Sequence, residues 1–177
     1  MSDAERPSRE TPDIMSAREL SWDSSFPTAL VVACSDGRTH APLATFLHDE
    51  LHIHRYDRLY VPGGAGALAP SGIEFTRAHR YRSECQFLIQ AHQLDTVVLL
   101  FHGPAADASS DALCGDYRRK FPNASNADIR HAQDHDLADI LRLELWHNVR
   151  IIVARHEVTQ EGRVQFTTLH DSEEHKQ

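Results

Sequence analysis

The chain lacks a long apolar segment: none of its runs approaches the roughly 20 apolar residues that a membrane-spanning helix needs. Cysteine is also scarce, with Cys34, Cys85 and Cys114 the only three in 177 residues, and the N-terminus shows no apolar signal segment. An odd and small number of cysteines argues against the disulfide framework of a secreted protein. We therefore expect a soluble, cytoplasmic protein with reduced thiols and no membrane contact.

Positive charge is in deficit. The 18 Lys and Arg residues stand against 26 Asp and Glu residues, which gives a formal net charge of −8. Proteins that bind nucleic acids or anionic membranes normally carry a basic excess or a basic stripe. Basic clusters such as Arg118–Lys120 are short here and typical of a solvated helix face. The charge balance therefore argues against a nucleic-acid partner.

The chain divides into three parts by composition. Residues 1–27 are rich in Ser, Pro and charged residues, and we expect them to form a partly flexible N-terminal arm. Residues 28–170 alternate strand-like with helix-like segments, and their number suits a single α/β domain. Residues 171–177 are expected to form a polar C-terminal tail.

The alternation within residues 28–170 predicts a three-layer fold, with a mostly parallel central sheet and helices on both of its faces. We expect strands at 29–33, 58–61, 96–101, 149–154 and 163–169, and helices at 41–52, 73–93, 111–120 and 127–149. The short connection at 159–162 is typical of a hairpin. The last strand is therefore expected to run antiparallel at the edge of the sheet.

Metal-binding side chains follow two of the predicted strands. The segment Cys34–Arg38, which reads Cys-Ser-Asp-Gly-Arg, comes directly after the apolar run Ala29–Ala33, and His102 follows the strand at 96–101. The carboxyl ends of neighbouring parallel strands converge on one crevice, so Cys34 and His102 can meet there. Zinc prefers thiolate and imidazole ligands, and a catalytic zinc site uses about three of them and keeps one position open. Cys114 is the natural candidate for the third ligand.

These residues resemble the beta-class carbonic anhydrases. That family has Cys-x-Asp-x-Arg after its first strand, a Gly-rich turn after the second, and His-x-x-Cys-Gly after a later strand. Cys34–Arg38 matches the first motif, Val61–Gly66 resembles the second, and His102 with Cys114 corresponds to the third. The chain departs from the family in two places. The eleven residues Gly103–Leu113 separate His102 from Cys114, where the family has two, and the Gly-rich turn lacks the family's Arg-Asn pair.

The resemblance implies a zinc enzyme that hydrates carbon dioxide reversibly to bicarbonate, with Cys34, His102 and Cys114 as the metal ligands. In such an enzyme zinc lowers the pKa of bound water to about 7, and the zinc-bound hydroxide attacks carbon dioxide. Asp36 would orient this hydroxide, or in a second state take the open zinc position, and Arg38 would keep Asp36 ionised. The family completes its pocket across a subunit interface, so a homodimer or a larger assembly is expected.

Other interpretations stay open at this point. The same scaffold could hydrolyse carbonyl sulfide or carbon disulfide, or the chain could be a noncatalytic homologue that binds zinc or a small anion. Cys85 occupies an apolar position of a predicted helix and is expected to be a small core residue. Two histidine sets could approach one another on helices, but exposed helical histidines without a metal are commoner: these sets are His48 with His52 and His54, and His131 with His135.

Overall fold

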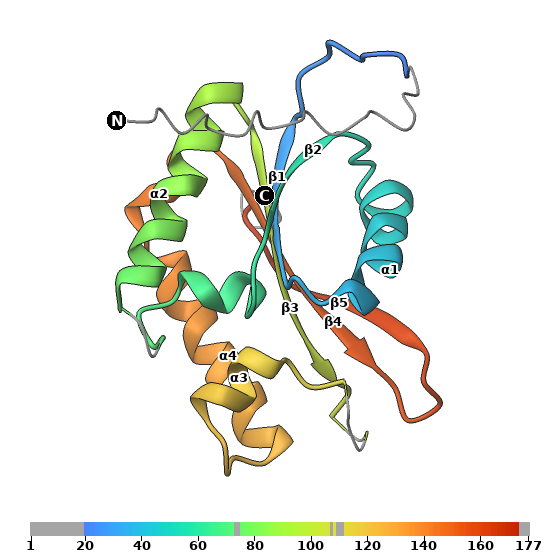
Figure 1. Cartoon of the computed structure of the whole chain (residues 1–177), viewed down its shortest axis with the longest axis vertical. Helices are drawn as coiled ribbons and strands as arrows, with labels where there is room; N and C mark the ends of the chain where they lie inside the picture. The colour runs from blue at the N-terminus through green and yellow to red at the C-terminus, as the bar shows by residue number, and fades with distance from the viewer. Residues whose placement is uncertain (1–19, 73–74, 107, 109–111, 174–177) are drawn as a thin grey trace, which may run out of the picture.

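The computed structural model describes residues 20–72, 75–106, 108 and 112–173 (Figure 1). Its centre is a five-stranded sheet in the order β2-β1-β3-β4-β5. Four neighbouring strands run parallel, namely β2 (Tyr56–Tyr60), β1 (Ala29–Ala33), β3 (Thr96–Pro104) and β4 (Arg150–Val158). β5 (Val164–Asp171) runs antiparallel beside β4 at the edge. The predicted arrangement of the sheet, mostly parallel with one antiparallel edge strand, is confirmed.

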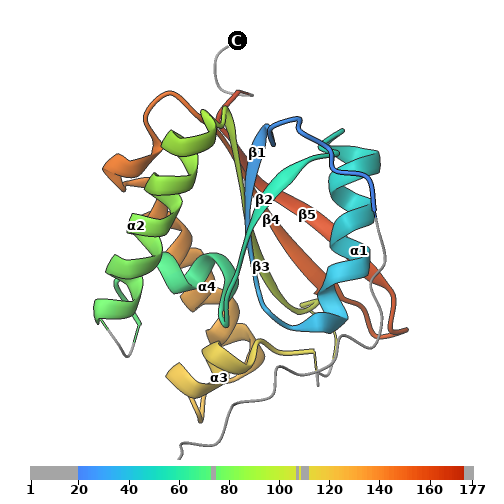
Figure 2. The same cartoon turned by 45° about the horizontal axis from the view of Figure 1, so that its top comes forward.

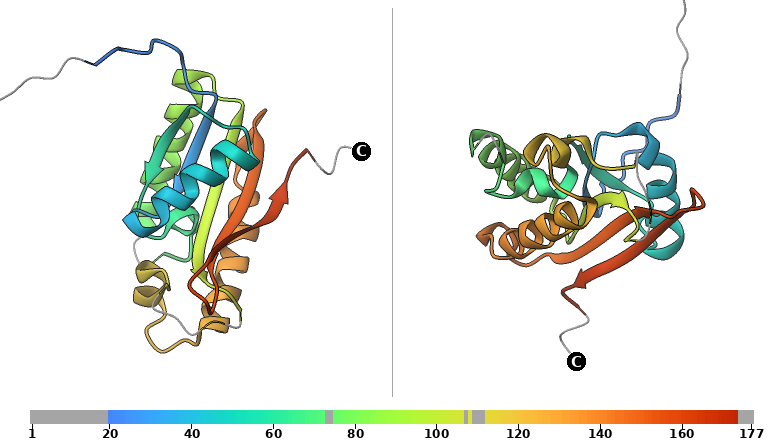
Figure 3. Two further views of the ribbon diagram at one scale, coloured as in Figure 1. Left: turned by 90° about the vertical axis from the view of Figure 1, so that its right-hand side faces the viewer. Right: turned by 90° about the horizontal axis from the view of Figure 1, so that it is seen from below.

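Helices cover both faces of this sheet. α2 (Phe75–His92) and α4 (Asn126–Leu141) lie on one face, and α1 (His40–Thr45) lies on the other, where the π-helical turn η2 (Phe46–Glu50) continues it (Figures 1 and 2). The view from below shows the sheet between these two layers (Figure 3). The predicted three-layer architecture is therefore confirmed.

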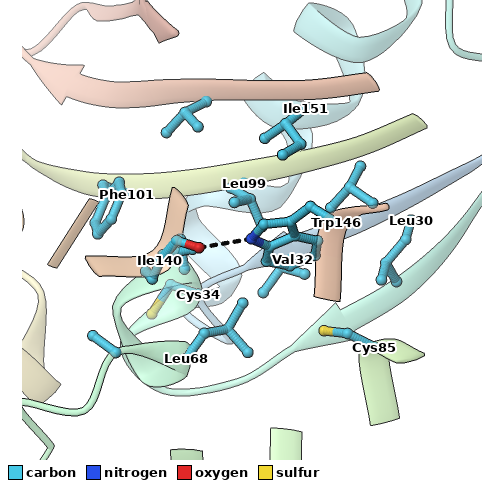
Figure 4. Close-up of a cluster of buried hydrophobic side chains, with 14 of the residues drawn as sticks. Leu30, Val32, Cys34, Leu68, Cys85, Leu99, Phe101, Ile140, Trp146 and Ile151 are labelled. Atoms are coloured by element: carbon cyan, nitrogen blue, oxygen red, sulfur yellow. Dashed lines mark hydrogen bonds between the residues drawn. The ribbon is translucent and has the colours of Figure 1, made fainter. Parts of the chain in front are cut away.

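The apolar strands β1 and β3 are buried on both faces because each face has its own core. Successive side chains of a strand point to opposite sides. Val32 and Leu99 accordingly join the cluster under α2 and α4, whereas Val31 and Val98 join the cluster under α1. The first cluster also contains Trp146, and its side chains interlock between the sheet and the helices (Figure 4).

The structure corrects the predicted helix at 127–149. α4 ends at Leu141, the backbone becomes extended at Leu143, and a separate 3₁₀ turn, η4 (Glu144–Trp146), follows. The indole Nε1 of Trp146 donates a hydrogen bond to the carbonyl oxygen of Ile140 at 2.7 Å (Figure 4). The same carbonyl oxygen also accepts from the Leu143 backbone N–H at 3.1 Å, so two donors bind the last turn and stabilise the early end of α4.

Two other predicted helices also differ from the observed ones. The segment predicted at 111–120 contains only the short α3 (Gly115–Lys120) within the described residues. The helix predicted at 41–52 is divided into α1 and the wider turn η2. The long predicted helix at 73–93 corresponds to α2, which begins at Phe75 and ends at His92.

β3 and β4 are longer than the predicted strands at 96–101 and 149–154. Their pairing continues through the partners His102 and His156 as far as Pro104 and Val158. The added residues of β4 include the buried polar side chains Arg155, His156 and Glu157, which hydropathy does not identify as part of a strand. His102 therefore lies within the last residues of β3 rather than beyond the strand, although still at its carboxyl end.

Most of the predicted N-terminal arm at 1–27 lies outside the described residues. Its described part contains no helix or strand from residue 20 to residue 27, and its apolar side chains Leu20, Trp22 and Phe26 are exposed. Of the predicted tail at 171–177, Asp171 belongs to β5, and residues 174–177 lie outside the described part. A search of the described residues found no helix with the length and apolar character that crossing a membrane requires.

Candidate metal centre

Three metal-binding side chains meet at the carboxyl end of the sheet. Cys34 directly follows β1, His102 lies near the end of β3, and Cys114 is the residue before α3. One ligand atom from each lies within 4.8 Å of the others, and all three residues are buried. The ligand atoms of a tetrahedral zinc site with sulfur and nitrogen ligands lie roughly 3.5 to 3.8 Å apart. The structure thus brings together the three residues predicted as ligands, at a spacing close to that of a zinc site.

The unsatisfied groups at this position fit a metal ion. Nε2 of His102 is buried and has no hydrogen-bond partner within the described part of the chain. All three cysteines are free thiols, so Cys34 and Cys114 do not form a disulfide. Buried polar atoms in folded proteins almost always have a partner, and an unpaired imidazole nitrogen beside two thiols therefore needs an explanation. Zinc coordination provides one, since thiolate and imidazole are its preferred protein ligands.

The electrostatics of the two thiols also fit a cation. The pKa of Cys34 lies well below its usual value, chiefly because the Cys114 thiol donates a hydrogen bond to it and also because His102 is close. The pKa of Cys114 is raised, because a charged Cys34 and burial both oppose its ionisation. The pair on its own therefore carries one negative charge between two sulfur atoms. A divalent cation would allow both to ionise, as ligation requires.

The Gly-rich turn packs against both cysteine-bearing segments. Gly64 opens the 3₁₀ turn η3 (Gly64–Leu68) with φ of +55°, and a Cβ atom there would lie 2.5 Å from the Leu100 carbonyl oxygen and 2.9 Å from the Cys34 nitrogen. A Cβ atom on Gly66 would overlap the side chain of Tyr117 in α3. These close approaches explain why the sequence has glycine at both positions.

Asp36 and Arg38 form a side-chain pair beside Cys34. The Arg38 guanidinium donates from Nη2 to Asp36 Oδ2 at 2.6 Å and from Nε to Oδ1 at 3.0 Å. The Arg38 backbone N–H also donates to Oδ1 at 3.1 Å, because Asp36 caps the short 3₁₀ turn η1 (Gly37–Thr39). The Arg38 side chain is the main reason that the pKa of Asp36 falls to about 2. Asp36 is therefore an ionised carboxylate in a fixed orientation near neutral pH.

An open groove of about 1200 Å³ leads to this centre from the α2 side of the sheet. Cys34 and Asp36 lie along its wall together with Arg77 of α2 and Asp116 of α3. Asp116 is buried and accepts hydrogen bonds from Arg77 at 2.9 Å and from Arg119 at 3.0 Å. Arg77 also donates to the carbonyl oxygen of Pro62, so it joins the Gly-rich turn to α3. A small molecule can thus reach Cys34 and Asp36 from solvent.

Several polar residues around the centre were not predicted from the sequence. Gln133 and Asp136 of α4 and Arg155 of β4 are buried and hydrogen-bonded behind the ligands. His156 is buried opposite His102, and its Nε2 has no partner among the described residues. A signal existed for the first two, because Gln133 and Asp136 continue the inward stripe of α4 formed by Ile129 and Ile140. Polar residues at the core-facing positions of a helix indicate buried hydrogen bonds, which here lie near the candidate site.

The other metal-binding candidates from the sequence do not form such a group. Cys85 is fully buried in α2, and burial raises the pKa of its thiol to about 12, which is typical of a small core residue. The rings of His48 and His54 lie 4.3 Å apart, and His48 binds Asp49. Within the described part of the chain, Cys34, His102 and Cys114 form the one group of at least three His, Cys or acidic side chains placed for a shared ion.

Comparison with family models and with curated proteins gave no match. Comparison with solved structures found a carbonic anhydrase from Streptococcus mutans, 18% identical, with a TM-score of 0.45 over 80% of this chain and 82% of that one. The beta-carbonic anhydrase of Aspergillus fumigatus is 13% identical, with a TM-score of 0.46 over 84% and 79%. The beta-carbonic anhydrase isoform I of Trichomonas vaginalis is 14% identical, with a TM-score of 0.46 over 86% of this chain and 88% of that one. Sequence identities and TM-scores this low assign no activity to this chain.

Proposed function

We propose that this chain is a zinc-dependent carbonic anhydrase, a divergent relative of the beta class, which converts carbon dioxide and water reversibly to bicarbonate. The observation that carries the proposal is the convergence of Cys34, His102 and Cys114, with an ionised Asp36 at the same strand end. The motif Cys34–Arg38 that resembles the family is therefore joined in space by the other two expected ligands. The long segment Gly103–Leu113 does not prevent this, because Cys114 still lies beside Cys34 and His102.

Cys34, His102 and Cys114 would hold a zinc ion, and three protein ligands are the usual number at a zinc site that also binds a small molecule. A zinc ion held by them supplies a Lewis acid that lowers the pKa of water to about 7 and so provides hydroxide for attack on carbon dioxide. Cys34 and burial raise the pKa of Cys114, and the backbone N–H groups of Tyr117 and Asp116 partly offset this increase; the backbone N–H of Asp36 adds to the lowering of the pKa of Cys34 that Cys114 and His102 cause. These backbone donors favour the thiolate forms that ligation requires.

Asp36 and Arg38 would orient the nucleophile. An ionised carboxylate can only accept hydrogen bonds, and Arg38 keeps Asp36 in that form. The two side chains are paired through both carboxylate oxygens, so Asp36 is directed by Arg38 and not free to rotate. In this arrangement Asp36 can accept a hydrogen bond from the attacking oxygen and hold its lone pair toward the carbon atom of the substrate.

The proposal is tested first by zinc content and then by stopped-flow hydration of carbon dioxide. We expect about one zinc ion per chain and a rate clearly above the uncatalysed one. Asp36→Asn should retain zinc and lower kcat by about 10²- to 10⁴-fold, the usual range for a group that assists proton transfer. Asp49→Asn is a matched control, because Asp49 is exposed and pairs with the neighbouring His48.

Two results would overturn the proposal. Protein that contains no zinc after purification and after incubation with the metal would remove its basis. Zinc-loaded protein that hydrates carbon dioxide at the background rate would reject the activity, and the same assay with carbonyl sulfide and carbon disulfide would then test the related hydrolase. A zinc-loaded protein that converts none of these three substrates would be a noncatalytic binding protein.

A further inference from the structure

Two polar side chains of α4 are buried behind the metal centre although neither is a predicted ligand. Gln133 is 3% exposed and Asp136 is 2% exposed. They are three residues apart, so they lie on the same face of the helix, which is directed at the sheet. Burying an amide and a carboxylate is costly unless each finds hydrogen-bond partners. Their partners lie in the two segments that carry His102 and Cys114.

Gln133 holds the strand end that carries His102. Its Nε2 donates to the backbone carbonyl oxygen of His102 at 3.0 Å, and its Oε1 accepts from Nε of Arg155 at 3.2 Å. Arg155 is itself buried and donates to Asp134 at 2.6 Å. Because a guanidinium can only donate, Arg155 fixes which end of the Gln133 amide faces His102. β1 pairs with β3 only as far as Leu99, so this contact supports β3 beyond that pairing.

Asp136 holds the helix that begins behind Cys114. Its Oδ2 accepts from the Tyr117 hydroxyl at 2.5 Å, and its Oδ1 accepts from Ser71 at 2.5 Å. Nζ of Lys120 lies 3.4 Å from Oδ2 and also donates to the carbonyl oxygen of Gly66 at 3.2 Å. Tyr117 and Lys120 both belong to α3, and both side chains are buried. One carboxylate therefore connects α4 to α3 and, through Lys120, to the Gly-rich turn.

From these contacts we propose that Gln133 and Asp136 are positioning residues of the metal centre, the first acting through His102 and the second through the segment that begins at Cys114. The inference rests on the zinc site of the proposed function. α3 has only six residues, and a helix that short is not stable by itself, so the direction of Cys114 depends on what α3 is attached to. Residues that orient metal ligands typically change metal affinity by about 10- to 100-fold when they are replaced.

The test measures zinc affinity by competition with a chromophoric chelator in Gln133→Met and Asp136→Asn. Methionine keeps the length of the glutamine side chain and removes its polar atoms, and asparagine keeps the shape of aspartate without its charge. We expect both variants to bind zinc about 10- to 100-fold more weakly than the wild-type chain. Asp139→Asn at a half-buried position of α4 and Gln90→Met at an exposed position of α2 are matched controls and should stay within about twofold of the wild-type affinity.

A second readout separates positioning from a general loss of stability. With cobalt(II) in place of zinc, the intensity of the visible bands and of the thiolate charge-transfer band reports the ligand geometry. Both α4 variants should change this spectrum. Ile152→Val, which destabilises the separate cluster under α1, should leave the spectrum and the affinity unchanged in folded protein. Zinc affinities and spectra like those of the wild type in both α4 variants, or equal losses in Ile152→Val, would overturn the inference.

The outcome can be read independently of the activity. Weaker zinc binding in the α4 variants of a chain that hydrates no carbon dioxide would support the positioning role and reject only the proposed reaction. Unchanged zinc binding in the variants of an active enzyme would reject only the positioning role.

Discussion

At the scale of single residues, the three cysteines have very different surroundings. Cys34 and Cys114 lie within reach of each other and of His102, and the Cys114 thiol lowers the pKa of Cys34, whereas Cys34 and burial raise that of Cys114. Cys85 lies in the apolar cluster between α2 and the sheet, where burial raises the pKa of its thiol to about 12. The same side chain is thus a ligand candidate at two positions and a packing residue at the third.

This contrast predicts opposite results from the same substitution. Cys114→Ala should reduce zinc content from about one ion per chain to a small fraction of that, because a site with one thiolate and one imidazole binds zinc weakly. Cys85→Ala should keep the zinc and cost only about 1 kcal/mol of stability, through the lost volume of one sulfur atom. Metal analysis of both purified variants checks the prediction. Retention of a full zinc complement in Cys114→Ala would exclude Cys114 as a ligand.

Two of the predicted ligands, Cys34 and His102, could be brought together from the sequence because their positions follow from topology, whereas Cys114 was proposed from the motif. Cys34 comes after one buried strand and His102 near the end of the next strand but one, and parallel neighbours place such residues at one edge. The partners of these ligands could not be found in the same way. Gln133 and Arg155 are far away in sequence, and which of their polar atoms would be paired depends on side-chain directions that only the packed fold determines.

At the scale of elements, the turn η3 is held at very short distances from its neighbours. The chain approaches Tyr117 at Gly66 so closely that no side chain fits, and Tyr117 cannot withdraw easily because its hydroxyl is bound to Asp136. The contact therefore connects the Gly-rich turn to α3 by steric fit as well as by the Lys120 hydrogen bond to Gly66.

We expect Gly66→Ala to destabilise the protein by about 1 to 3 kcal/mol, the usual cost of inserting an atom into a filled site. Gly103→Ala is the matched control, because a Cβ atom at Gly103 would meet no other atom within 4 Å. Urea unfolding of both variants provides the measurement. A Gly66→Ala protein as stable as the Gly103→Ala protein would show that the turn and α3 can separate without cost.

Element boundaries were the weaker part of the sequence prediction, for reasons that differ between elements. β4 is longer than predicted because its polar residues Arg155 and Glu157 find partners in α4 and β5. α4 is shorter than predicted because Trp146 binds the carbonyl group of Ile140, and the chain then turns along the sheet. Both differences come from contacts between distant segments, whereas the antiparallel edge follows from the local hairpin pattern at 159–162.

At the scale of the whole molecule, an ion pair binds the end of the last strand, β5, to the beginning of β4. Arg150 of β4 donates to Asp171 of β5 from Nη2 at 2.6 Å and from Nε at 3.1 Å. The Arg150 side chain is the largest of the effects that lower the pKa of Asp171, and the backbone N–H of Glu173 adds to it. The last strand thus depends in part on an ionised carboxylate.

This pair predicts a specific dependence of stability on pH. The folded pKa of Asp171 lies below its unfolded value of about 3.9, so the pair stabilises fully above that pH and is lost as the pH falls through the folded value. Asp171→Asn should cost about 1 kcal/mol at pH 7, and the difference from the wild-type chain should shrink below about pH 4. Urea unfolding at both pH values tests this. A difference that is unchanged in acid would show that the carboxylate charge contributes nothing.

The assembly of the molecule remains a prediction. We predict a homodimer or a larger assembly, because the described part of the arm leaves the large apolar side chains of Leu20, Trp22 and Phe26 at least 70% exposed, a surface that a second chain would cover. Light scattering should then give at least about twice the chain mass of 20.0 kDa. A mass of one chain at about 50 μM would contradict the prediction.

The anchoring of α3 has a consequence for the chain between His102 and Cys114. Hydrogen bonds from α3 to α4 and to the Gly-rich turn hold α3 in place. The position of Cys114 therefore does not depend on the length of the peptide that precedes it. We therefore expect zinc binding to survive circular permutation. In such a variant a linker joins the original termini, and the new termini lie within residues 103–113.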